Sequence, residues 1–283
     1  MKSHSIIAVT LLFFIALSIQ GNAQISWKKQ EAVDNLPLQL FHSPQSINLP
    51  TVETLQQGDF EFEISHRFLP SIKDGSKDLY GFDGPVNMRI ALGYAVTDDL
   101  VLTLGRSNVD DNLDFKGKYR LLQFKETFLP MLVGLQFGIA KNTQILKPIA
   151  SSGRAYQYFG QIIFNTMVNK KLGLGLVPSY LYNGNIYRSD VQNSFTLGMN
   201  AQYYFTNMFS VLAEFNPTVN GYLNRFNSAA FGIELETGGH FFKIILTNNV
   251  KLNPTQFLSG ADKDYGSGEW RLGFNITRLL KFL

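Results

Sequence analysis

The stretch VQNSFTLGMNAQYYF, residues 191–205, alternates apolar and polar side chains with a period of two. One parity carries the apolar side chains Phe195, Leu197, Met199, Ala201, Tyr203 and Phe205. The other parity carries Ser194, Thr196, Gly198, Asn200, Gln202 and Tyr204. Because successive side chains of a strand point to opposite faces, this pattern predicts a β-strand with one apolar and one polar face. Its length exceeds the five or six residues usual in globular sheets and fits a strand that crosses a bilayer around a polar lumen.

Strand-like segments of the same kind follow one another from Gly58 to the end of the chain. Together with the stretch above they predict about twelve strands, at Asp59–Phe68, Val86–Val96, Leu100–Ser107, Leu113–Gln123, Phe128–Ala140, Tyr156–Val168, Leu172–Tyr182, Val191–Phe205, Phe209–Phe215, Phe226–Thr237, His240–Val250 and Glu269–Phe282. Bacterial barrels made from a single chain have an even number of antiparallel strands. The fold class we predict is therefore all-β, a transmembrane antiparallel up-and-down β-barrel over residues 58–283.

The connections between these segments alternate between short and long. The short ones include residues 97–99, 169–171, 206–208 and 238–239, whereas the long ones include 69–85, 141–155 and 251–268. Outer-membrane barrels have short periplasmic turns and long outer loops, so the alternation places both ends of the barrel in the periplasm. A soluble β-sandwich or a lipocalin-like barrel is the alternative, but neither has a reason to sort its connections in this way.

The composition agrees with an exported membrane protein. Charged residues make up 17% of the chain, below the quarter or so usual in soluble domains, and aromatic residues make up 13%. The net charge of +3 and the lack of a Lys/Arg tract argue against nucleic acid as a partner. The chain has no cysteine, which excludes disulfides, lipoprotein acylation and thiolate metal sites.

The N-terminus reads as a cleavable secretory signal over residues 1–23. Lys2 precedes an apolar run from Ile6 to Ile19, and Gly21–Ala23 offers a small-x-small cleavage site. Residues 24–57 are polar and lack a strong period, so we interpret them as a periplasmic extension or a segment tucked into the barrel mouth as a plug. A disordered linker is the alternative.

Aromatic residues are expected to form two girdles at the membrane interfaces. Phe60, Tyr94, Phe209 and Phe241 would form the periplasmic girdle, and Tyr156, Tyr182, Phe215 and Trp270 the outer one. The last strand alternates apolar residues and ends on Phe282, which resembles the signal that the barrel-assembly machinery reads, although Leu283 follows it. We therefore expect outer-membrane lipid and this machinery as partners.

Two stretches resemble a known family. They are SPQSINLPTVETLQQGDFEFEISHRF, residues 43–68, and LYGFDGPVNMRIALGYAVTDDLVLTLGRS, residues 79–107. The family consists of predicted outer-membrane β-barrel proteins and is catalogued as a domain of unknown function. The resemblance runs from about Ser43 to the C-terminus. It implies the fold and the location, the outer membrane of a Gram-negative cell, but no activity, and it carries over no functional residue.

The inward parity of the predicted strands places charged residues in the lumen. The candidate lumen charges are Glu61, Glu63, Arg67, Arg89, Lys116, Lys118, Glu234, Glu236, Lys243 and Arg271. In a packed barrel they would form a network of ion pairs. In an open barrel, the basic residues toward the outer half and the glutamates toward the periplasmic half would form a pore that favours anions at its outer mouth.

Two other kinds of site would leave recognisable residues in the sequence. An outer-membrane phospholipase uses a Ser and a His on the lipid-facing surface, but Ser65 and His66 are adjacent and must face opposite sides; Ser107 is a more distant candidate. The oxygen-rich stretch from Asn108 to Asp114 could ligate Ca²⁺ but lacks the EF-hand pattern, and a solvated hairpin is the simpler interpretation. No cofactor, metal or catalytic residue is therefore predicted.

The function predicted from the sequence is that of a narrow channel or transporter for small solutes. The alternative is a closed structural or binding barrel whose outer loops engage a partner, and a lipid-modifying enzyme is the third. Twelve strands leave a small lumen, which residues 24–57 could obstruct further.

Overall fold

The computed structural model of the protein describes residues 38–125 and 129–281, which form an all-β structure. The predicted signal peptide, residues 24–37 of the predicted extension, and Phe282 lie outside the described residues. The strands are β1 (Phe60–Phe68), β2 (Val86–Thr97), β3 (Leu100–Ser107), β4 (Asn112–Phe124), β5 (Met131–Asn142), β6 (Tyr156–Val168), β7 (Leu172–Tyr182), β8 (Ser194–Tyr204), β9 (Phe209–Asn216), β10 (Thr218–Gly221), β11 (Ser228–Glu236), β12 (His240–Thr247) and β13 (Arg271–Leu280). The short helices are η1 (Ile72–Gly81), η2 (Val109–Asp111), α2 (Lys147–Ala150), η3 (Gly153–Ala155) and α3 (Pro254–Phe257).

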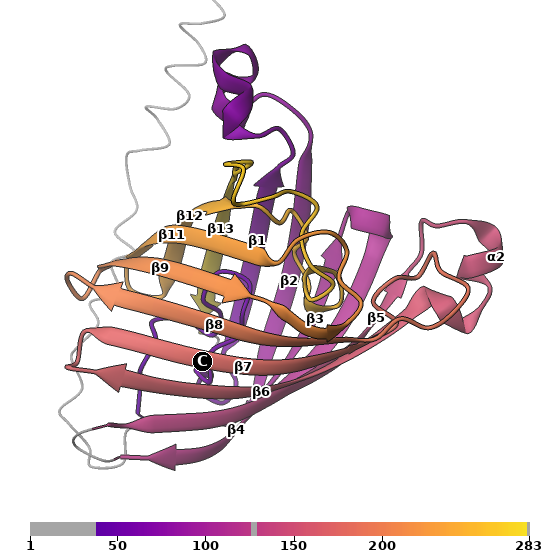
Figure 1. Cartoon of the computed structure of the whole chain (residues 1–283). Helices are drawn as coiled ribbons and strands as arrows, with labels where there is room; N and C mark the ends of the chain where they lie inside the picture. The colour runs from indigo at the N-terminus through magenta and orange to yellow at the C-terminus, as the bar shows by residue number, and fades with distance from the viewer. Residues whose placement is uncertain (1–37, 126–128, 282–283) are drawn as a thin grey trace, which may run out of the picture. The chain divides into compact units, whose positions relative to one another are not determined.

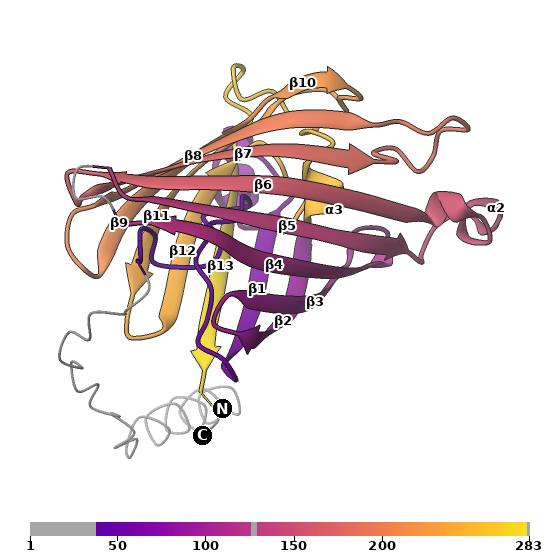
Figure 2. The same cartoon turned by 90° about the horizontal axis from the view of Figure 1, so that it is seen from below.

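The strands close into a barrel. Each strand from β1 to β8 pairs antiparallel with the next, β1 also pairs with β13, and β13 continues through β12 and β11 to β9. The pairing of β8 with β9 completes the ring. Figures 1 and 2 show β6, β7 and β8 lying side by side along one wall, with β1 and β13 in the opposite part of the ring. The predicted twelve-stranded antiparallel barrel is confirmed.

One additional strand was not predicted. β10 follows β9 after Pro217 and pairs with the first residues of β8, whereas β9 pairs with the later ones. Proline has no backbone N–H to donate, so it interrupts the ladder, while its carbonyl still accepts the N–H of Leu197 at 3.0 Å. β9 and β10 therefore pair one after the other with the same edge of β8.

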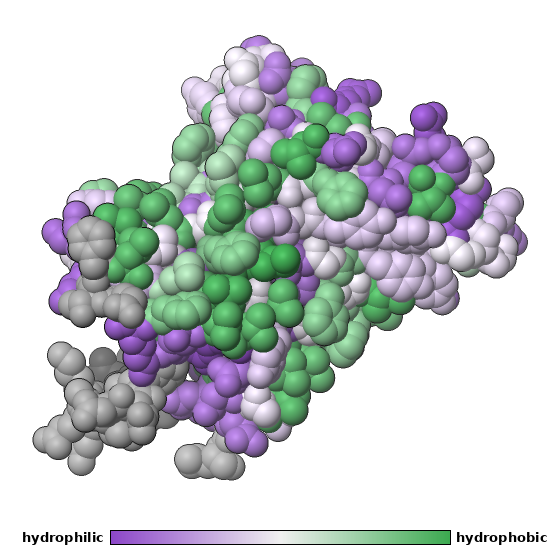
Figure 3. Space-filling view, turned by 60° about the horizontal axis from the view of Figure 1, so that its bottom comes forward, coloured by the Kyte–Doolittle hydropathy of each residue, from purple (hydrophilic) through white to green (hydrophobic). Residues whose placement is uncertain are grey.

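The two faces of the wall have the polarity that the alternation predicted. In β8, Phe195, Met199 and Tyr203 are exposed on the outer face, whereas Asn200 and Gln202 are buried on the inner face. Figure 3 shows apolar side chains gathered over the outer wall. In a membrane this face contacts hydrocarbon, which explains why so many large apolar side chains are left uncovered.

The connections also follow the predicted alternation. Short turns join β2 to β3, β6 to β7, β8 to β9 and β11 to β12, the last through Gly238 and Gly239, both with positive φ. The longer connections at the other end carry η1, α2, η3 and α3, and Figure 2 shows α2 beyond the ends of β5 and β6. None of the helices in the described part of the chain is long and apolar enough to cross a membrane.

One residue of the predicted girdles is placed differently. Phe241 is buried and has the same parity on β12 as Lys243, so it faces the barrel interior, and Phe242 is the exposed aromatic residue. The prediction for Phe241 was wrong because two adjacent phenylalanines leave the parity ambiguous. Phe60 and Tyr94 do meet on the neighbouring strands β1 and β2, with ring centroids 4.8 Å apart, and the ring of Trp270, just before β13, lies 5.5 Å from that of Phe231 on β11.

Candidate functional site in the barrel interior

The residues Leu38–Gln57, which we call the inner segment, hydrogen-bond to inward-facing side chains of the barrel wall. Glu214 of β9 makes the densest set of these contacts. Its carboxylate accepts the backbone N–H groups of Ile47 at 2.6 Å, Asn48 at 2.9 Å and Leu49 at 2.9 Å. Several N–H groups converging on one carboxylate give charge-assisted hydrogen bonds, which are stronger than neutral ones. Glu214 therefore holds a turn of the inner segment against β9.

Two lysines hold the carbonyl groups of the same segment. The Nζ atom of Lys118 on β4 donates to the carbonyl oxygens of Pro44 at 2.9 Å and Thr51 at 3.1 Å. The Nζ atom of Lys243 on β12 donates to the Oγ of Ser43 and the carbonyl oxygen of Ser46, each at 2.7 Å. An ammonium group offers three donors, so one lysine can satisfy several carbonyls that lack a partner in regular structure.

Further contacts fix the segment within itself and against other strands. The carboxylate of Glu53 accepts the backbone N–H groups of Leu40 at 2.7 Å and Phe41 at 3.0 Å. The side-chain oxygen of Asn165 on β6 accepts the N–H of Val52 at 2.7 Å, and the side-chain nitrogen of Asn275 on β13 donates to Ile47 O at 2.9 Å. The inner segment thus has hydrogen-bond partners on strands all around the ring.

Four of the candidate lumen charges form ion pairs with one another, Arg89 with Glu63 and Lys243 with Glu234. Arg89 bridges Glu63 at 3.0 Å and Asp114 at 2.8 Å. Glu234 pairs with Lys243 at 3.2 Å and accepts a hydrogen bond at 2.8 Å from Nδ1 of His42 in the inner segment. Opposite charges are therefore mixed along the wall. These contacts resemble the network of ion pairs that we expected for a packed barrel.

The remaining candidates are buried or lie near the rim. Arg67 donates to the side-chain oxygens of Asn48 at 3.0 Å and Asn275 at 2.8 Å, and Arg271 pairs with Asp262 at 2.7 Å. Glu236, at the periplasmic end of β11, is half-buried and accepts the N–H of Gly239 at 3.0 Å. The set is completed by Lys116 and Lys118, which are buried, and by Glu61, which is half-buried.

Part of the interior is apolar, which the sequence analysis did not predict. Leu132, Phe159, Ile163, Val177 and Leu181 point inward from β5, β6 and β7 and are buried. They pack against four residues of the inner segment and two residues at α3, namely Leu40, Phe41, Leu49, Val52, Phe257 and Leu258. The signal was present in β6 and β7, where both parities carry apolar residues, as expected for strands covered on both faces.

The connection from β12 to β13 covers the interior from the outer side. Its residues from Leu252 to Ala261, including the whole of α3, are buried. Asn253 caps α3 by accepting the N–H of Gln256 at 3.1 Å, and its side-chain nitrogen donates to Asn112 at the start of β4. Gln157 of β6 donates to the carbonyl oxygen of Thr255 at 3.2 Å. We call residues 251–262 the outer cover.

Sequence reasoning named Lys118 and Lys243 but overlooked other residues that bind the inner segment closely. Glu214 is the only acidic residue in FSVLAEFN of β9 and has inward parity, so the pattern could have identified it. Glu53, Asn165 and Asn275 gave no such signal, because their role depends on where the inner segment lies.

The residues considered for other chemistry are placed apart. His66 faces outward with its ring stacked 4.5 Å from that of Phe274, whereas Ser65 and Ser107 are buried on the inner face. These residues therefore do not form the lipid-facing Ser–His pair of a phospholipase. Asp110 accepts a hydrogen bond from the hydroxyl of Tyr187 at 2.5 Å, and no group of three potential metal-ligating His, Cys, Asp or Glu residues occurs within residues 38–125 and 129–281.

The sequence of almost the whole barrel matches a known protein family. The family described as "Membrane bound beta barrel domain (DUF5777)" matches residues 41–280. The chain belongs to this family. The match begins in the inner segment, so the family includes that segment as well as the strands. The protein is an outer-membrane β-barrel, and membrane lipid surrounds its outer face.

Solved structures with a similar fold are outer-membrane proteins of low sequence identity. An outer membrane channel from Pseudomonas putida F1 is 13% identical with a TM-score of 0.48, over 81% of this chain and 98% of the other. The NanC porin is 11% identical with a TM-score of 0.47, over 79% and 100%. The KdgM porin is 9% identical with a TM-score of 0.45, over 80% and 99%. None of the curated proteins is significantly similar in sequence.

Proposed function

We propose that the protein is a narrow channel for small water-soluble solutes and that the inner segment closes it as a plug. The observation that carries this proposal is the polar attachment of the segment. Glu214, Lys118 and Lys243 bind its backbone through hydrogen bonds to single residues, without the continuous strand pairing that would make it part of the wall. Water can replace the polar contacts, and departure of the segment would also separate its four apolar residues from the cluster on β5 to β7, but it would break no strand pairing of the barrel.

The wall behind the plug supports passage of hydrophilic solutes. On one side it carries the charged residues described above. On the other side, β5 to β7 present neutral amides and a hydroxyl beside the apolar cluster described above, with Gln136 donating to Gln161 at 2.8 Å and Gln161 donating to Ser179 at 3.0 Å. A lumen lined in this way would fill with water once the plug is displaced.

A closed structural or binding barrel is the second candidate. The outer cover favours it, because a second part of the chain fills the interior from the other end. In that case the exposed outer loops would engage a partner, and neither end would open.

Ion conductance of the refolded protein in planar bilayers separates the two candidates. We would compare the full chain with a variant lacking residues 38–57 and with one that also has residues 252–261 replaced by a short Gly/Ser linker. A channel should conduct weakly or rarely as the full chain and much more strongly after the deletions. Heat-modifiable migration on gels checks that each variant forms a barrel.

Two results would decide against the channel. Barrels that are folded but do not conduct after both deletions would leave the closed barrel as the function. Conductance of the full chain that the deletions leave unchanged would mean that the inner segment is not a plug.

The ion preference is a separate part of the proposal. An anion preference at the outer mouth was expected from the basic residues of the outer half, namely Arg67, Arg89, Lys116, Lys118 and Arg271. Of these, Arg89 and Arg271 pair with carboxylates, which weakens their field. The anion preference stays a prediction. Reversal potentials measured in a salt gradient would test it. Recognition of the C-terminal strand by the barrel-assembly machinery likewise stays a prediction.

A further inference from the structure

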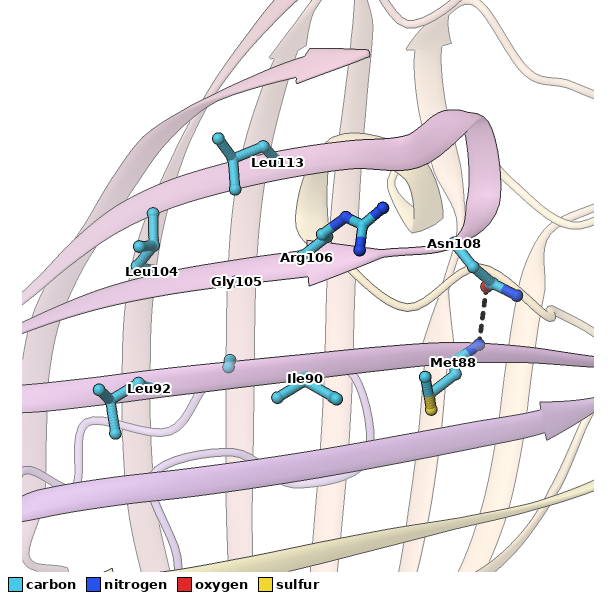
Figure 4. Close-up of a pocket in the computed structure, with 9 residues that line it drawn as sticks. Met88, Ile90, Leu92, Leu104, Gly105, Arg106, Asn108 and Leu113 are labelled. Carbon is cyan, nitrogen blue, oxygen red and sulfur yellow. Dashed lines mark hydrogen bonds between the residues drawn. The ribbon is translucent and has the colours of Figure 1, made fainter. Parts of the chain in front are cut away.

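The outer wall carries an amphipathic slot between β2, β3 and β4, on the face opposite to the interior discussed above. It has a volume of about 390 Å³. Its floor and sides are Ile90 and Leu92 of β2, Leu104 of β3 and Leu113 of β4, each more than 40% exposed. Figure 4 shows these side chains on the three strands, with Arg106 at the end of the slot near the hairpin that joins β3 to β4.

The slot is polar only at its outer end. Arg106 is the last outward-facing residue of β3, and its side chain is 67% exposed. Asn108 also lines this end, but its side chain is engaged with β2, accepting the N–H of Met88 at 2.8 Å and donating to Val86 O at 3.0 Å. The available charge at the end of the slot is therefore that of the guanidinium group.

A second cation lies close to Arg106. Leu113 pairs with Arg106 on one side and with Lys141 of β5 on the other, so two strand spacings separate the basic residues, about 10 Å between their Cα atoms. Lys141 is the last outward-facing residue of β5, and its Nζ lies 5.3 Å from the ring centroid of Tyr156. Basic and aromatic residues at strand ends are found where lipid headgroups meet hydrocarbon.

The acidic residues of the hairpin already have partners. Asp111 accepts from Nη2 of Arg106 and, through its other oxygen, from the hydroxyl of Thr143 at 3.0 Å. Asp110 accepts from Tyr187. In the described part of the chain, Nε and Nη1 of Arg106 make no hydrogen bond, and an arginine has five donors. Asp111 thus orients the guanidinium group from one edge and leaves donors for an anionic ligand.

We propose that this slot binds a membrane lipid whose phosphate headgroup has a net negative charge. An acyl chain lies along Ile90, Leu92, Leu104 and Leu113, and the phosphate accepts hydrogen bonds from Arg106 with Lys141 as the second cation. Apolar side chains below a pair of cations match the chemistry of such a lipid, because the chain contributes buried apolar area and the headgroup contributes charge attraction. The site is independent of whether the barrel conducts.

Native mass spectrometry of the full chain in detergent tests the site with two lipids of equal chain length, phosphatidylglycerol and phosphatidylcholine. The intact protein should retain phosphatidylglycerol preferentially. Arg106→Gln and Lys141→Gln should each weaken that preference about fivefold, the factor that corresponds to about 1 kcal/mol per basic residue at a membrane surface. Arg278→Gln is the matched control, since Arg278 is an exposed arginine at the periplasmic end of β13.

Two further measurements test the slot and the source of the phosphate. Leu104→Trp places a large ring in the slot and should reduce retention of both lipids while heat-modifiable migration stays unchanged. Excess inorganic phosphate should not displace phosphatidylglycerol, because it lacks the chain. Equal retention of the two lipids by the intact protein, an unchanged preference in Arg106→Gln, or displacement by inorganic phosphate would each overturn the proposal.

Discussion

At the scale of single residues, the interior is held by charged side chains that bind backbone groups of another part of the chain. Glu214 provides the clearest example, with three backbone N–H groups of the inner segment on one carboxylate. Removing a partner leaves buried donors without an acceptor, which costs more than the hydrogen bond itself contributes. The effect should be local, because the wall around Glu214 keeps its own ladder to β8 and β11.

Glu214→Ala should therefore loosen the inner segment without unfolding the barrel. We expect amide hydrogen exchange at residues 47–49 to become faster by about tenfold or more, since a hydrogen bond to a charged group contributes about 1.5–3 kcal/mol. Exchange mass spectrometry in detergent micelles measures this. Glu236→Ala, which removes a glutamate at the rim, is the control, and equal exchange rates in the two variants would contradict the role of Glu214.

A pH effect is expected from Lys251 in the outer cover. Burial lowers the pKa of Lys251 to about 8 from an ordinary value of 10.5, although Asp262 and Asp110 oppose the shift. Between these two values the folded state binds fewer protons than the unfolded state, so the free energy of unfolding should rise with pH across this window. The thermal midpoint in detergent measures the rise.

Lys251→Met should remove this contribution. The variant has no ammonium group to bury, so its thermal midpoint should change less between pH 8 and pH 10.5 than that of the intact protein. A pH dependence identical in the two proteins would show that Lys251 does not titrate in this window.

At the scale of elements, particular glycines allow neighbouring strands and inward-facing side chains to pack closely. A Cβ atom at Gly138 of β5 would meet Phe115 O, the ring of Phe159 at 2.7 Å and Lys116 Cα at 3.0 Å. Two of these are backbone atoms, which cannot move without disturbing β4. Gly160 of β6 has no such neighbour within 4 Å.

Gly138→Ala should thus destabilise the barrel, and Gly160→Ala should not. Overpacking of this kind costs about 1–3 kcal/mol, which should appear as a lower urea midpoint and a smaller fraction of heat-modifiable, refolded protein. If both variants refold like the intact protein, β4 and β5 are less tightly packed at this point than their contacts indicate.

At the scale of the whole molecule, the inner segment and the wall depend on each other. Three buried side chains of the wall form hydrogen bonds with the segment, namely Lys118, Lys243 and Glu214. Breaking one side of a buried charged contact is strongly destabilising when water cannot replace the lost partner. The segment is therefore expected to act on stability as well as on access to the lumen.

A barrel without residues 38–57 should unfold at a lower temperature than the full chain, and a synthetic peptide of these residues should restore part of the difference. Circular dichroism during heating in detergent measures both. A peptide of the same composition in scrambled order is the control. An unchanged midpoint after deletion would mean that water solvates the exposed charges as well as the segment does.

The sequence by itself determined the barrel, its twelve main strands and the polarity of its two faces. These features depend on local alternation and on connection lengths, which each short stretch carries on its own, as residues 191–205 illustrate. The same alternation placed the charged candidates on the inward parity, and it failed at Phe241, where two adjacent phenylalanines obscure the parity.

Only the tertiary structure decided what fills the interior. The contacts of Glu214 with Ile47, and of Asn253 with Asn112, join residues more than a hundred positions apart. The apolar cluster on β5, β6 and β7 likewise acquires its partners from the inner segment and α3. No local period encodes such pairings, because they arise when closure of the ring brings distant segments into one enclosed space with unsatisfied polar groups.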